Sequence, residues 1–497
     1  MSLGLSQKFS ILEQSPYDAD PAPTLESEPQ AVAATRWVPS RYNVRATTGD
    51  GRLVLWNSYA GTMSVFDVAQ RSAIEGMLRR QGFAAAPEGA VKYLHDRGFL
   101  IKEGTDEYRR IQLGFGQQHY RTDILQLILL ASEDCNFRCQ YCYEEFARGT
   151  MQPRVRSGIK KLVEKRIAGL RNLSISWFGG EPLYGFPAIE ELAPFFLAAA
   201  EEHNLKFSSN MTTNGYLLTP EVADKLFAWN IRSFQITVDG PPDEHDRNRP
   251  TRDGQGSFAA IYENLEALHR RADDFAIDLR FNFDRQSGQR AAELLGLFES
   301  AFSGDTRFKL RFRPIGKWGG PNDAQLNVCG TDEAASLQLE MKREARKRGL
   351  SLADDIVHVQ GLGAQVCYAA RPYNFIIGAT GKLMKCTIDL DMHDRNVIGQ
   401  LTDEGDMEID RDKFALWTEP AFEKDTQCQK CVILPACQGV FCPQIRIEHG
   451  ISPCSPLRSS AKKEILEAVE SSAHGARRVA VEGGSRRPVT APPPTSI

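Results

Sequence analysis

The sequence contains no apolar run that approaches the ~20 residues that a membrane-spanning helix needs. Its first residues, MSLGLSQKFSILEQ, lack the basic, apolar and small-residue regions of a secretion signal. There is also no excess of charge of one sign, since 60 Lys and Arg face 64 Asp and Glu. This balance disfavours nucleic acid and membrane surfaces as partners. These absences predict a cytoplasmic protein.

No cysteine precedes residue 135, although the chain has eleven. Cysteines used only for packing would be scattered, whereas three of these lie on one short segment and seven fall between residues 367 and 454. A reducing compartment disfavours disulfides, so the clustering indicates metal or redox chemistry. The candidate metal ligands are Cys135, Cys139, Cys142, Cys329, Cys367, Cys386, Cys428, Cys431, Cys437, Cys442 and Cys454.

A length of 497 residues predicts two or three domains. The start of the chain is polar and rich in Pro, Ala and Glu, which is typical of a flexible segment, and its end is similar. We therefore expect five segments: a flexible leader at 1–35, an N-terminal module at 36–116, an α/β core at 117–318, a cysteine-rich region at 319–460, and a C-terminal helix with a disordered tail at 461–497.

The N-terminal module has the pattern of a small α+β unit. RYNVRAT and RLVLWNS alternate like two strands around the turn Gly49-Asp50-Gly51. A helical segment (EGAVKYLHDRG) follows, then FLI as a strand and YRRIQLGF as another strand. This order predicts a winged-helix-like fold. A plain stabilising extension fits the pattern equally well.

Strands and helices alternate from residue 124 to about 315, which predicts about six βα units in a parallel sheet or partial (β/α)6 barrel. Ligands bind at the C-terminal ends of the strands in such folds. The three-cysteine segment follows the first strand and Gly179-Gly180-Glu181-Pro182 follows the second, so both should lie on the working face. The predicted strands are LQLILLA, LSISWF, LKFSSNM, SFQITVDG, FAIDLRFNF and FKLRFRP.

The first three thiols can bind three irons of a cubane, since thiolates are the usual ligands of iron–sulfur clusters. One iron then stays open to an exogenous ligand unless a distant cysteine joins. A zinc site and coincidence are the alternatives. Structural zinc usually has a fourth ligand nearby, and the next cysteine is Cys329.

CNFRCQYCY has the pattern C-x3-C-x2-C with an aromatic residue before the third cysteine, and GGEP follows at 179–182. Together these segments resemble the radical S-adenosylmethionine (SAM) enzymes over residues 124–315. The resemblance implies that Cys135, Cys139 and Cys142 bind a [4Fe–4S] cluster as the catalytic centre. It implies that SAM chelates the open iron and is cleaved to a 5′-deoxyadenosyl radical.

The resemblance also implies a SAM pocket. Gly179 and Gly180 would let the backbone approach the methionyl amino group, and Glu181 would pair with it, although a turn that ends a strand also fits. HDRNR offers Arg247 or Arg249, for which solvated loop arginines are the alternative. The other implied contacts are Tyr141 stacked on adenine, Ser208, Asn210 and Thr213 near the ribose, and Thr237 and Asp239 near the SAM carboxylate. Asp284 is placed either as a base or as a helix cap.

Residues 319–460 have few long periodic elements and eight cysteines, which predicts a loop-rich fold held by metal. Their spacing, with Gly381 between Cys367 and Cys386, resembles the SPASM domain of radical SAM enzymes that modify peptides. It differs in that four residues, rather than the usual three, lie between Cys437 and Cys442. The resemblance implies two auxiliary [4Fe–4S] clusters, three in all; zinc knuckles are the alternative. One would use Cys428, Cys431, Cys437 and Cys454, and the other Cys367, Cys386 and Cys442 with either Cys329 or another ligand.

The order of the three parts resembles maturases of ribosomally made peptides. It implies that the N-terminal module binds the leader of a precursor peptide at a sheet edge within RYNVRATTGDGRLVLWNS. It also implies a reductant such as flavodoxin or ferredoxin, and a thioether or carbon–carbon cross-link as product. A sulfatase-type formylglycine maturase is the first alternative, although the long segment before Cys135 disfavours it. A non-catalytic iron–sulfur or zinc protein that binds DNA is the second.

Overall fold

The computed structural model describes residues 35–146, 148–353, 361–390 and 394–479. All but the last residue of the predicted leader, and the end of the predicted tail, lie outside these ranges. The described part divides into two compact units: residues 35–119, 361–367 and 420–479 form one, and residues 120–353 and 368–419 form the other. The cysteine-rich region 319–460 is thus shared between the units, and the predicted domain boundaries stay predictions. Within the described residues, no helix is long and apolar enough to cross a membrane.

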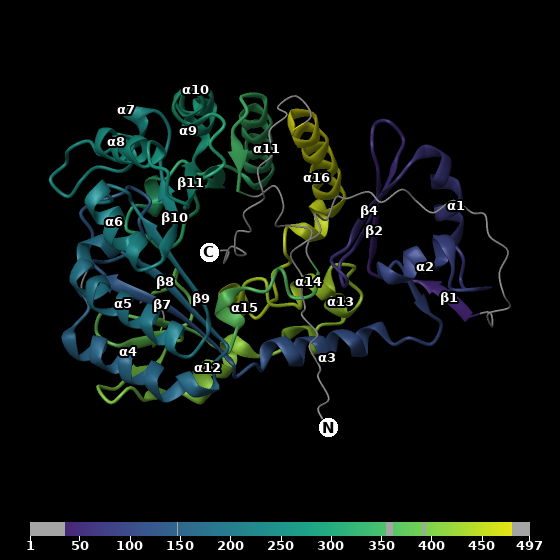
Figure 1. Ribbon diagram of the computed structural model, residues 1–497, viewed down its shortest axis with the longest axis horizontal. Coiled ribbons are helices and arrows are strands. Elements are labelled where there is room, and N and C mark those ends of the chain that lie inside the picture. Colours follow the sequence, from purple (N-terminus) through teal and green to yellow (C-terminus); the bar gives the residue numbers. More distant parts are fainter. Residues whose placement is uncertain (1–34, 147, 354–360, 391–393, 480–497) are drawn as a thin grey trace. The chain divides into compact units, whose positions relative to one another are not determined.

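The larger unit is built on an eleven-stranded sheet (Figure 1). Strands run in the order β13-β12-β11-β10-β9-β8-β7-β14 in parallel, and β15, β16 and β17 extend the sheet antiparallel. Strands β7 to β12 coincide with the six predicted strands, so the α/β fold with a large parallel sheet is confirmed. The bounds are β7 (Ile124–Ser132), β8 (Asn172–Gly179), β9 (Lys206–Thr213), β10 (Ile231–Thr237), β11 (Ala276–Phe283), β12 (Phe308–Pro314), β13 (Ser351–Leu352), β14 (Asn374–Ile377), β15 (Lys382–Met384), β16 (Val397–Leu401) and β17 (Met407–Ile409).

The parallel strands have one apolar and one polar face. On β11 the buried Ile277, Leu279 and Phe281 alternate with Asp278 and Arg280, because successive side chains of a strand point to opposite faces. Helices that alternate with the strands along the chain cover the apolar face (Figure 1). The polar face is therefore the one available for a site.

Some helices of this unit begin at a capping side chain. At α6, Thr219 accepts a hydrogen bond from the Val222 N–H and Pro220 occupies the first turn. Among the described residues of 319–460, α11 is the one long helix, and its buried residues are sparse. The helices are α4 (Pro153–Arg166), η1 (Ile167–Gly169), η2 (Pro182–Gly185), α5 (Phe186–Glu202), α6 (Pro220–Ala228), α7 (Pro242–Asn248), α8 (Phe258–His269), α9 (Arg285–Gln289), α10 (Ala291–Phe302), η3 (Asp323–Gln325), α11 (Thr331–Lys347), η4 (Tyr368–Ala370) and α12 (Arg411–Thr418).

The smaller unit contains two three-stranded antiparallel sheets, β5-β1-β6 and β2-β3-β4. The predicted hairpin (β2–β3) and the FLI strand (β6) are confirmed. The predicted strand YRRIQLGF is wrong, because these residues lie in α3, where Ile111, Gly114 and Phe115 are buried at helical spacing. The bounds are β1 (Thr35–Pro39), β2 (Asn43–Thr47), β3 (Leu53–Asn57), β4 (Met63–Phe66), α1 (Val68–Leu78), β5 (Phe83–Ala85), α2 (Gly89–Asp96), β6 (Leu100–Lys102), α3 (Glu107–His119), η5 (Ala421–Glu423), α13 (Thr426–Gln429), α14 (Leu434–Cys437), α15 (Pro443–His449) and α16 (Leu457–Val479).

The N-terminal hairpin and the C-terminal cysteine segment share one hydrophobic core inside the smaller unit. Val54 and Trp56 of β3 pack with Ile433, Leu457 and Ile465, and all five are at most 3% exposed. A hydrogen bond of 2.6 Å from the Ser58 hydroxyl to the Val432 carbonyl joins the same segments. Residues separated by some four hundred positions in the chain therefore stabilise one another.

Candidate functional site

The loop after β7 brings three thiols together in the larger unit. Burial, followed by repulsion from Glu181 and from the other two thiols, raises the pKa of Cys135. Burial and the Cys139 thiol raise the pKa of Cys142 to about 12. Burial also raises the pKa of Cys139, which a nearby Arg249 partly offsets. Iron would offset the cost of deprotonating these buried thiols, because metal binding holds thiols deprotonated.

These donors fit an iron–sulfur cluster. The Phe137 N–H lies 3.3 Å from the Cys135 sulfur, as expected of a hydrogen bond to a cluster thiolate. Within the described residues, no three His, Cys, Asp or Glu side chains are grouped closely enough to hold a single metal ion. A cubane distributes its thiolates over different irons and so spaces them more widely than one tetrahedral ion does.

A strap of residues 248–252 holds the cysteine loop from one side. The Arg138 N–H donates to the Pro250 carbonyl at 2.9 Å, and the Gln140 N–H donates to the Asn248 carbonyl at 2.9 Å. The Arg252 N–H donates back to Asn136 at 2.7 Å. This short antiparallel ladder fixes the loop backbone through a segment more than a hundred residues away in the chain.

The Gly179-Gly180-Glu181 turn after β8 holds the loop from the other side. The Gly180 N–H donates to Ser132 at 3.0 Å and the Glu181 N–H to Asp134 at 3.1 Å. Gly179 has φ +118°, and a Cβ there would overlap the Ser132 carbonyl oxygen. Gly179 is thus required by close approach of the β7 backbone, and Gly180 by close approach of the Asp134 carbonyl in the cysteine loop. Approach of the methionyl group, the sequence-based reason, stays a prediction.

Three polar side chains form a buried triangle beside the loop. The Tyr141 hydroxyl donates to Asp239 and accepts from Arg249 at 2.6 Å and from the Asn282 amide at 3.1 Å. Asp239 also accepts from the Asn282 N–H at 2.8 Å and lies 3.6 Å from the Arg249 guanidinium. Among the described residues the buried Arg249 Nε has no hydrogen-bond partner. The triangle places a positive charge next to Cys139.

His245 fixes the return of the chain from Asp239 to Arg249, and sequence reasoning missed it. Its Nδ1 accepts from the Asp239 N–H at 3.1 Å, so the neutral ring carries its proton on Nε2 and donates to Ser257 at 3.1 Å. The Ser257 hydroxyl donates in turn to the Arg249 carbonyl at 2.7 Å. Burial lowers the pKa of His245 well below its ordinary value. The quoted segment HDRNR contains this histidine, but no local pattern identifies its partners.

The Glu181 carboxylate accepts hydrogen bonds from its own turn and from the end of β9. Its carboxylate accepts from the Leu183 N–H at 3.0 Å, the Thr213 hydroxyl at 2.7 Å and the Asn214 N–H at 2.7 Å. Burial raises its pKa against these bonds. It therefore ties the ends of β8 and β9 together, as the turn alternative predicted, and its pairing with SAM stays a prediction.

Strand alternation separates Thr213 from Ser208 and Asn210. Ser208 lies on the polar face, where its hydroxyl donates to Ser174 at 3.0 Å, and Asn210 shares this face. Thr213 points to the opposite side, toward Glu181. Thr237 is on the polar face in register with Arg280. The three predicted ribose contacts of β9 are thus not brought together.

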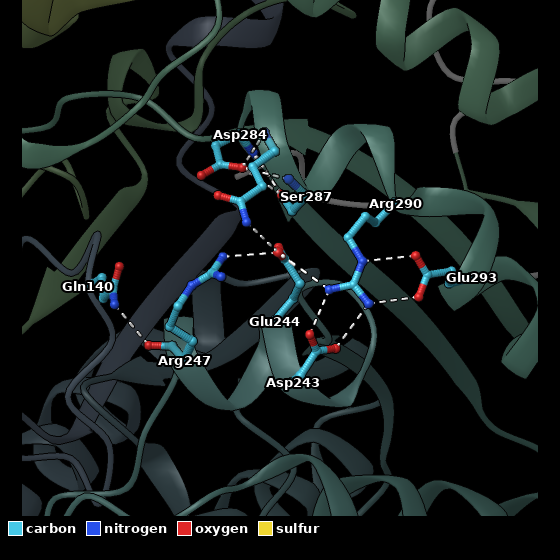
Figure 2. Close-up of polar contacts among 9 residues, drawn as sticks. Gln140, Asp243, Glu244, Arg247, Asp284, Ser287, Arg290 and Glu293 are labelled. Carbon is cyan, nitrogen blue, oxygen red and sulfur yellow. Dashed lines mark hydrogen bonds and ion pairs between the residues drawn. The ribbon is translucent and has the colours of Figure 1, made fainter.

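Asp284 and Arg247 take structural positions (Figure 2). Asp284 caps α9 by accepting from the Ser287 N–H at 2.8 Å, which confirms the helix-cap alternative. Arg247 is partly exposed in the last turn of α7, where it pairs with Glu244 at 3.1 Å. Figure 2 also shows Arg290 between Asp243 and Glu293.

Four further thiols converge in the smaller unit. Burial, a nearby Asp425 and the thiols of Cys437 and Cys431 raise the pKa of Cys428 to about 12. Burial raises the pKa of Cys437, which accepts hydrogen bonds from the N–H groups of Gly439, Ser455 and Phe441. A left-handed backbone at Gln438 and Gly439 turns the N–H groups of Gly439 and Phe441 toward the sulfur. Arg458 lies near Cys428, Cys431 and Cys454, which places Cys454 in the same group of thiols.

The other cysteines are divided between the units. Cys367 and Cys442 belong to the smaller unit, and Cys442 precedes α15 as its N-cap. Cys386 is buried after β15 in the larger unit, where its N–H donates to Asn396 at 2.8 Å. Cys329 lies beside Glu333, Asp284 and Arg285. The predicted second auxiliary site stays a prediction.

Residues 129–285 match the sequence profile of the Radical SAM superfamily. The chain carries a radical SAM domain. This domain implies a [4Fe–4S] cluster and SAM, and it supports a catalytic role.

Two relatives and one solved structure extend the comparison. The chain is 29% identical over 203 residues to the radical SAM cyclopropyl synthase TigE of Paramaledivibacter caminithermalis, covering 36% of this chain and 40% of that protein. It is 23% identical over 325 residues to the serine-type anaerobic sulfatase-maturating enzyme of Klebsiella aerogenes, covering 62% of this chain and 77% of the enzyme. The structure of anSMEcpe with bound AdoMet and Cp18Cys peptide aligns with a TM-score of 0.54 at 18% identity, covering 72% of this chain and 100% of that chain. This last likeness shows the fold.

Proposed function

We propose that the protein is a radical SAM peptide maturase that forms a thioether or carbon–carbon cross-link in a ribosomally made precursor peptide. One observation carries the proposal: three mutually close thiols lie beside the buried Arg249–Asp239–Tyr141 triangle, where the parallel strands end. When bound, the cluster and SAM supply a 5′-deoxyadenosyl radical. The relatives support a peptide or protein substrate, since one matures a sulfatase and anSMEcpe binds a peptide.

The residues around the loop hold and orient the cofactors in this proposal. Cys135, Cys139 and Cys142 are the ligands, and the strap and the glycine turn keep their spacing. Arg249 offsets the negative charge of three thiolates, while Asp239 keeps its guanidinium in place. Burial excludes water, which protects a radical from side reactions.

The smaller unit supplies the auxiliary chemistry. We assign one [4Fe–4S] cluster to Cys428, Cys431, Cys437 and Cys454, supported by their convergence and by the N–H groups directed at Cys437. The second auxiliary cluster that the sequence predicts belongs to the same proposal. When bound, an auxiliary cluster would supply an acceptor for the electron that leaves the peptide radical as the new bond forms, and the oxidised form of a carrier such as flavodoxin or ferredoxin would accept that electron in turn.

The leader of the precursor peptide would bind at β2. In the sheet order β2-β3-β4 the strand β3 is central, so only β2 of the predicted segment offers an edge. An extended peptide adds to such an edge through main-chain hydrogen bonds. The hairpin also packs on the cysteine segment, so leader and auxiliary site would belong to one unit.

A sulfatase-type formylglycine maturase is an equally supported reading. The match to the Klebsiella aerogenes enzyme covers 62% of this chain, more than the match to the cyclopropyl synthase. Such an enzyme would oxidise a Ser or Cys to formylglycine and form no cross-link. The non-catalytic DNA-binding alternative is disfavoured by the radical SAM domain.

Anaerobic co-expression separates these reactions. The full chain would be expressed with a candidate precursor peptide, sought in a small gene beside its own, and, in parallel, with a sulfatase-derived peptide that carries Ser or Cys. Tandem mass spectrometry should show the loss of two hydrogens and a cross-link in the first peptide. An aldehyde in the second peptide, detected with a hydrazine probe, would establish the sulfatase reading instead. Cys431→Ala should still cleave SAM and release no finished product.

A further inference from the structure

Arg458, in the first turn of α16, lies beside the four thiols of the smaller unit. Its Nη1 donates to the Cys454 sulfur at 2.8 Å. The Cys431 and Cys428 thiols also lie near the guanidinium. Within the described residues Arg458 forms no ion pair with a carboxylate, so its charge is directed at sulfur. A surface arginine more often pairs with Asp or Glu or points into solvent.

The chemistry of the site gives this contact a consequence. The reduction potential of an iron–sulfur cluster depends on its net charge and on hydrogen bonds to its sulfurs. A cubane with four thiolates becomes more negative by one charge when it accepts an electron, so a fixed guanidinium stabilises the reduced form more than the oxidised form. A hydrogen bond to a thiolate acts in the same direction, since it withdraws electron density.

We infer that Arg458 raises the reduction potential of the auxiliary cluster and thereby makes it a better acceptor for the electron that leaves the peptide radical. The inference rests on the proposed cluster at Cys428, Cys431, Cys437 and Cys454. In that step one electron passes from the substrate radical to the cluster and one proton is lost to solvent as the new bond forms. The flavodoxin- or ferredoxin-type partner, in its oxidised form, then accepts this electron from the cluster.

Redox titration followed by electron paramagnetic resonance tests the inference. The full chain would carry Ala at Cys135, Cys139 and Cys142, so that the first cluster contributes no signal. A transition that disappears on adding Cys431→Ala belongs to the Arg458 site. Arg458→Gln should lower the reduced-to-oxidised ratio of that transition about tenfold at a fixed applied potential, a shift of ~59 mV for a one-electron couple.

Two further variants test whether the positive charge of Arg458 sets the reduction potential. Arg458→Lys keeps the charge and should retain most of the potential. Lys463→Gln removes a charge from an exposed position of the same helix and should leave the potential unchanged. A potential in Arg458→Lys as low as that of Arg458→Gln would show that the effect depends on the geometry of the guanidinium rather than on its charge.

The outcomes distinguish this inference from the proposed function. An unchanged potential in an iron-loaded Arg458→Gln protein overturns the inference and leaves the cluster in place. Zinc in the Cys428 site, or no transition sensitive to Cys431→Ala, overturns the auxiliary cluster itself. Arg458→Met is a second neutral variant of similar length. Loss of iron in both neutral variants also overturns the inference, because the arginine is then needed to hold the cluster.

Discussion

Arg249 and Asp239 are charged groups held almost entirely away from water, at 6% and 0% exposure. Buried charges persist only when they are paired and hydrogen-bonded. Here each also meets Tyr141, and Arg249 retains a free Nε next to the thiols. At the residue scale, the site is a group of three thiols balanced by one cation whose position a tyrosine and an aspartate fix.

Cys139→Ala should abolish SAM cleavage, because two thiols cannot hold a cubane with one open iron. Chromatography of 5′-deoxyadenosine after anaerobic reduction with dithionite measures the effect. Cys329→Ala is the matched control, since Cys329 is in the same unit and outside the loop. Cleavage by the Cys139→Ala protein at the rate of the control would contradict the assignment of the loop.

The cysteine loop is not stable by itself as an element. It gains its shape from two neighbours, the 248–252 strap and the 179–181 turn, each joined to it through backbone hydrogen bonds. Neither neighbour contributes a thiol. Changes in these elements should therefore affect iron binding without removing any ligand.

Gly179→Ala should reduce iron at the first site. The positive φ alone costs about 1–3 kcal/mol for a residue with a Cβ, and the overlap with Ser132 adds to it. Iron analysis and the resonance signal of the first cluster measure the loss. Gly169→Ala serves as control, since a Cβ there meets no atom within 4 Å. Equal iron in the two variants would show that the turn does not position the loop.

His245 should make the protein less stable in acid. Its folded-state pKa is lowered by burial, so the unfolded chain binds the proton more readily below an ordinary pKa of ~6.5. Stability is then lost as the pH falls, by up to about 1.4 kcal/mol per pH unit until the folded-state pKa is reached.

Thermal unfolding of the anaerobic protein between pH 5 and pH 7.5 (roughly one unit either side of that ordinary pKa) measures this dependence. His245→Gln should unfold more easily at neutral pH and show a weaker pH dependence. His203→Gln, at an exposed histidine of the same unit, should behave as the parent protein. A pH dependence unchanged by His245→Gln would mean that other groups are responsible.

At the scale of the whole molecule, the chain is organised in two units that do not follow its order. The smaller unit joins the N-terminal module to the C-terminal cysteine segment, and the larger one carries the parallel sheet with the three-thiol loop. The segment 368–419 extends that sheet through β14 to β17. Auxiliary iron should therefore depend on residues near the N-terminus.

Trp56→Ala should lower iron at the Cys428 site, whereas Trp37→Ala should not. Both tryptophans are at most 1% exposed in the smaller unit, and either truncation costs about 3–5 kcal/mol. Only Trp56 shares a core with Ile433 and Cys437, because Trp37 packs in a separate core with Leu78. Iron content at matched temperature distinguishes them. An equal loss in both would indicate general unfolding rather than a shared core.

Much of this architecture could be predicted because it follows from local sequence patterns. Six apolar runs gave the six strands from β7 to β12, since burial on one face and the two-residue period act within a few positions. The same reasoning failed at YRRIQLGF, where helical burial of Ile111 and Phe115 prevailed. It also placed Thr213 with Ser208 and Asn210, although strand alternation separates them.

By itself, the sequence determined the α/β class, the order of the elements and the thiols that stand close together along the chain. Only the tertiary structure decided which distant groups meet them: Arg249 and Asp239 at the first loop, His245 beneath them, and Arg458 and Trp56 around the second group of thiols. The physical reason is range. Periodicity and spacing record forces between near neighbours, whereas a buried charge or a shared core is stabilised by partners that the fold brings together from remote parts of the chain.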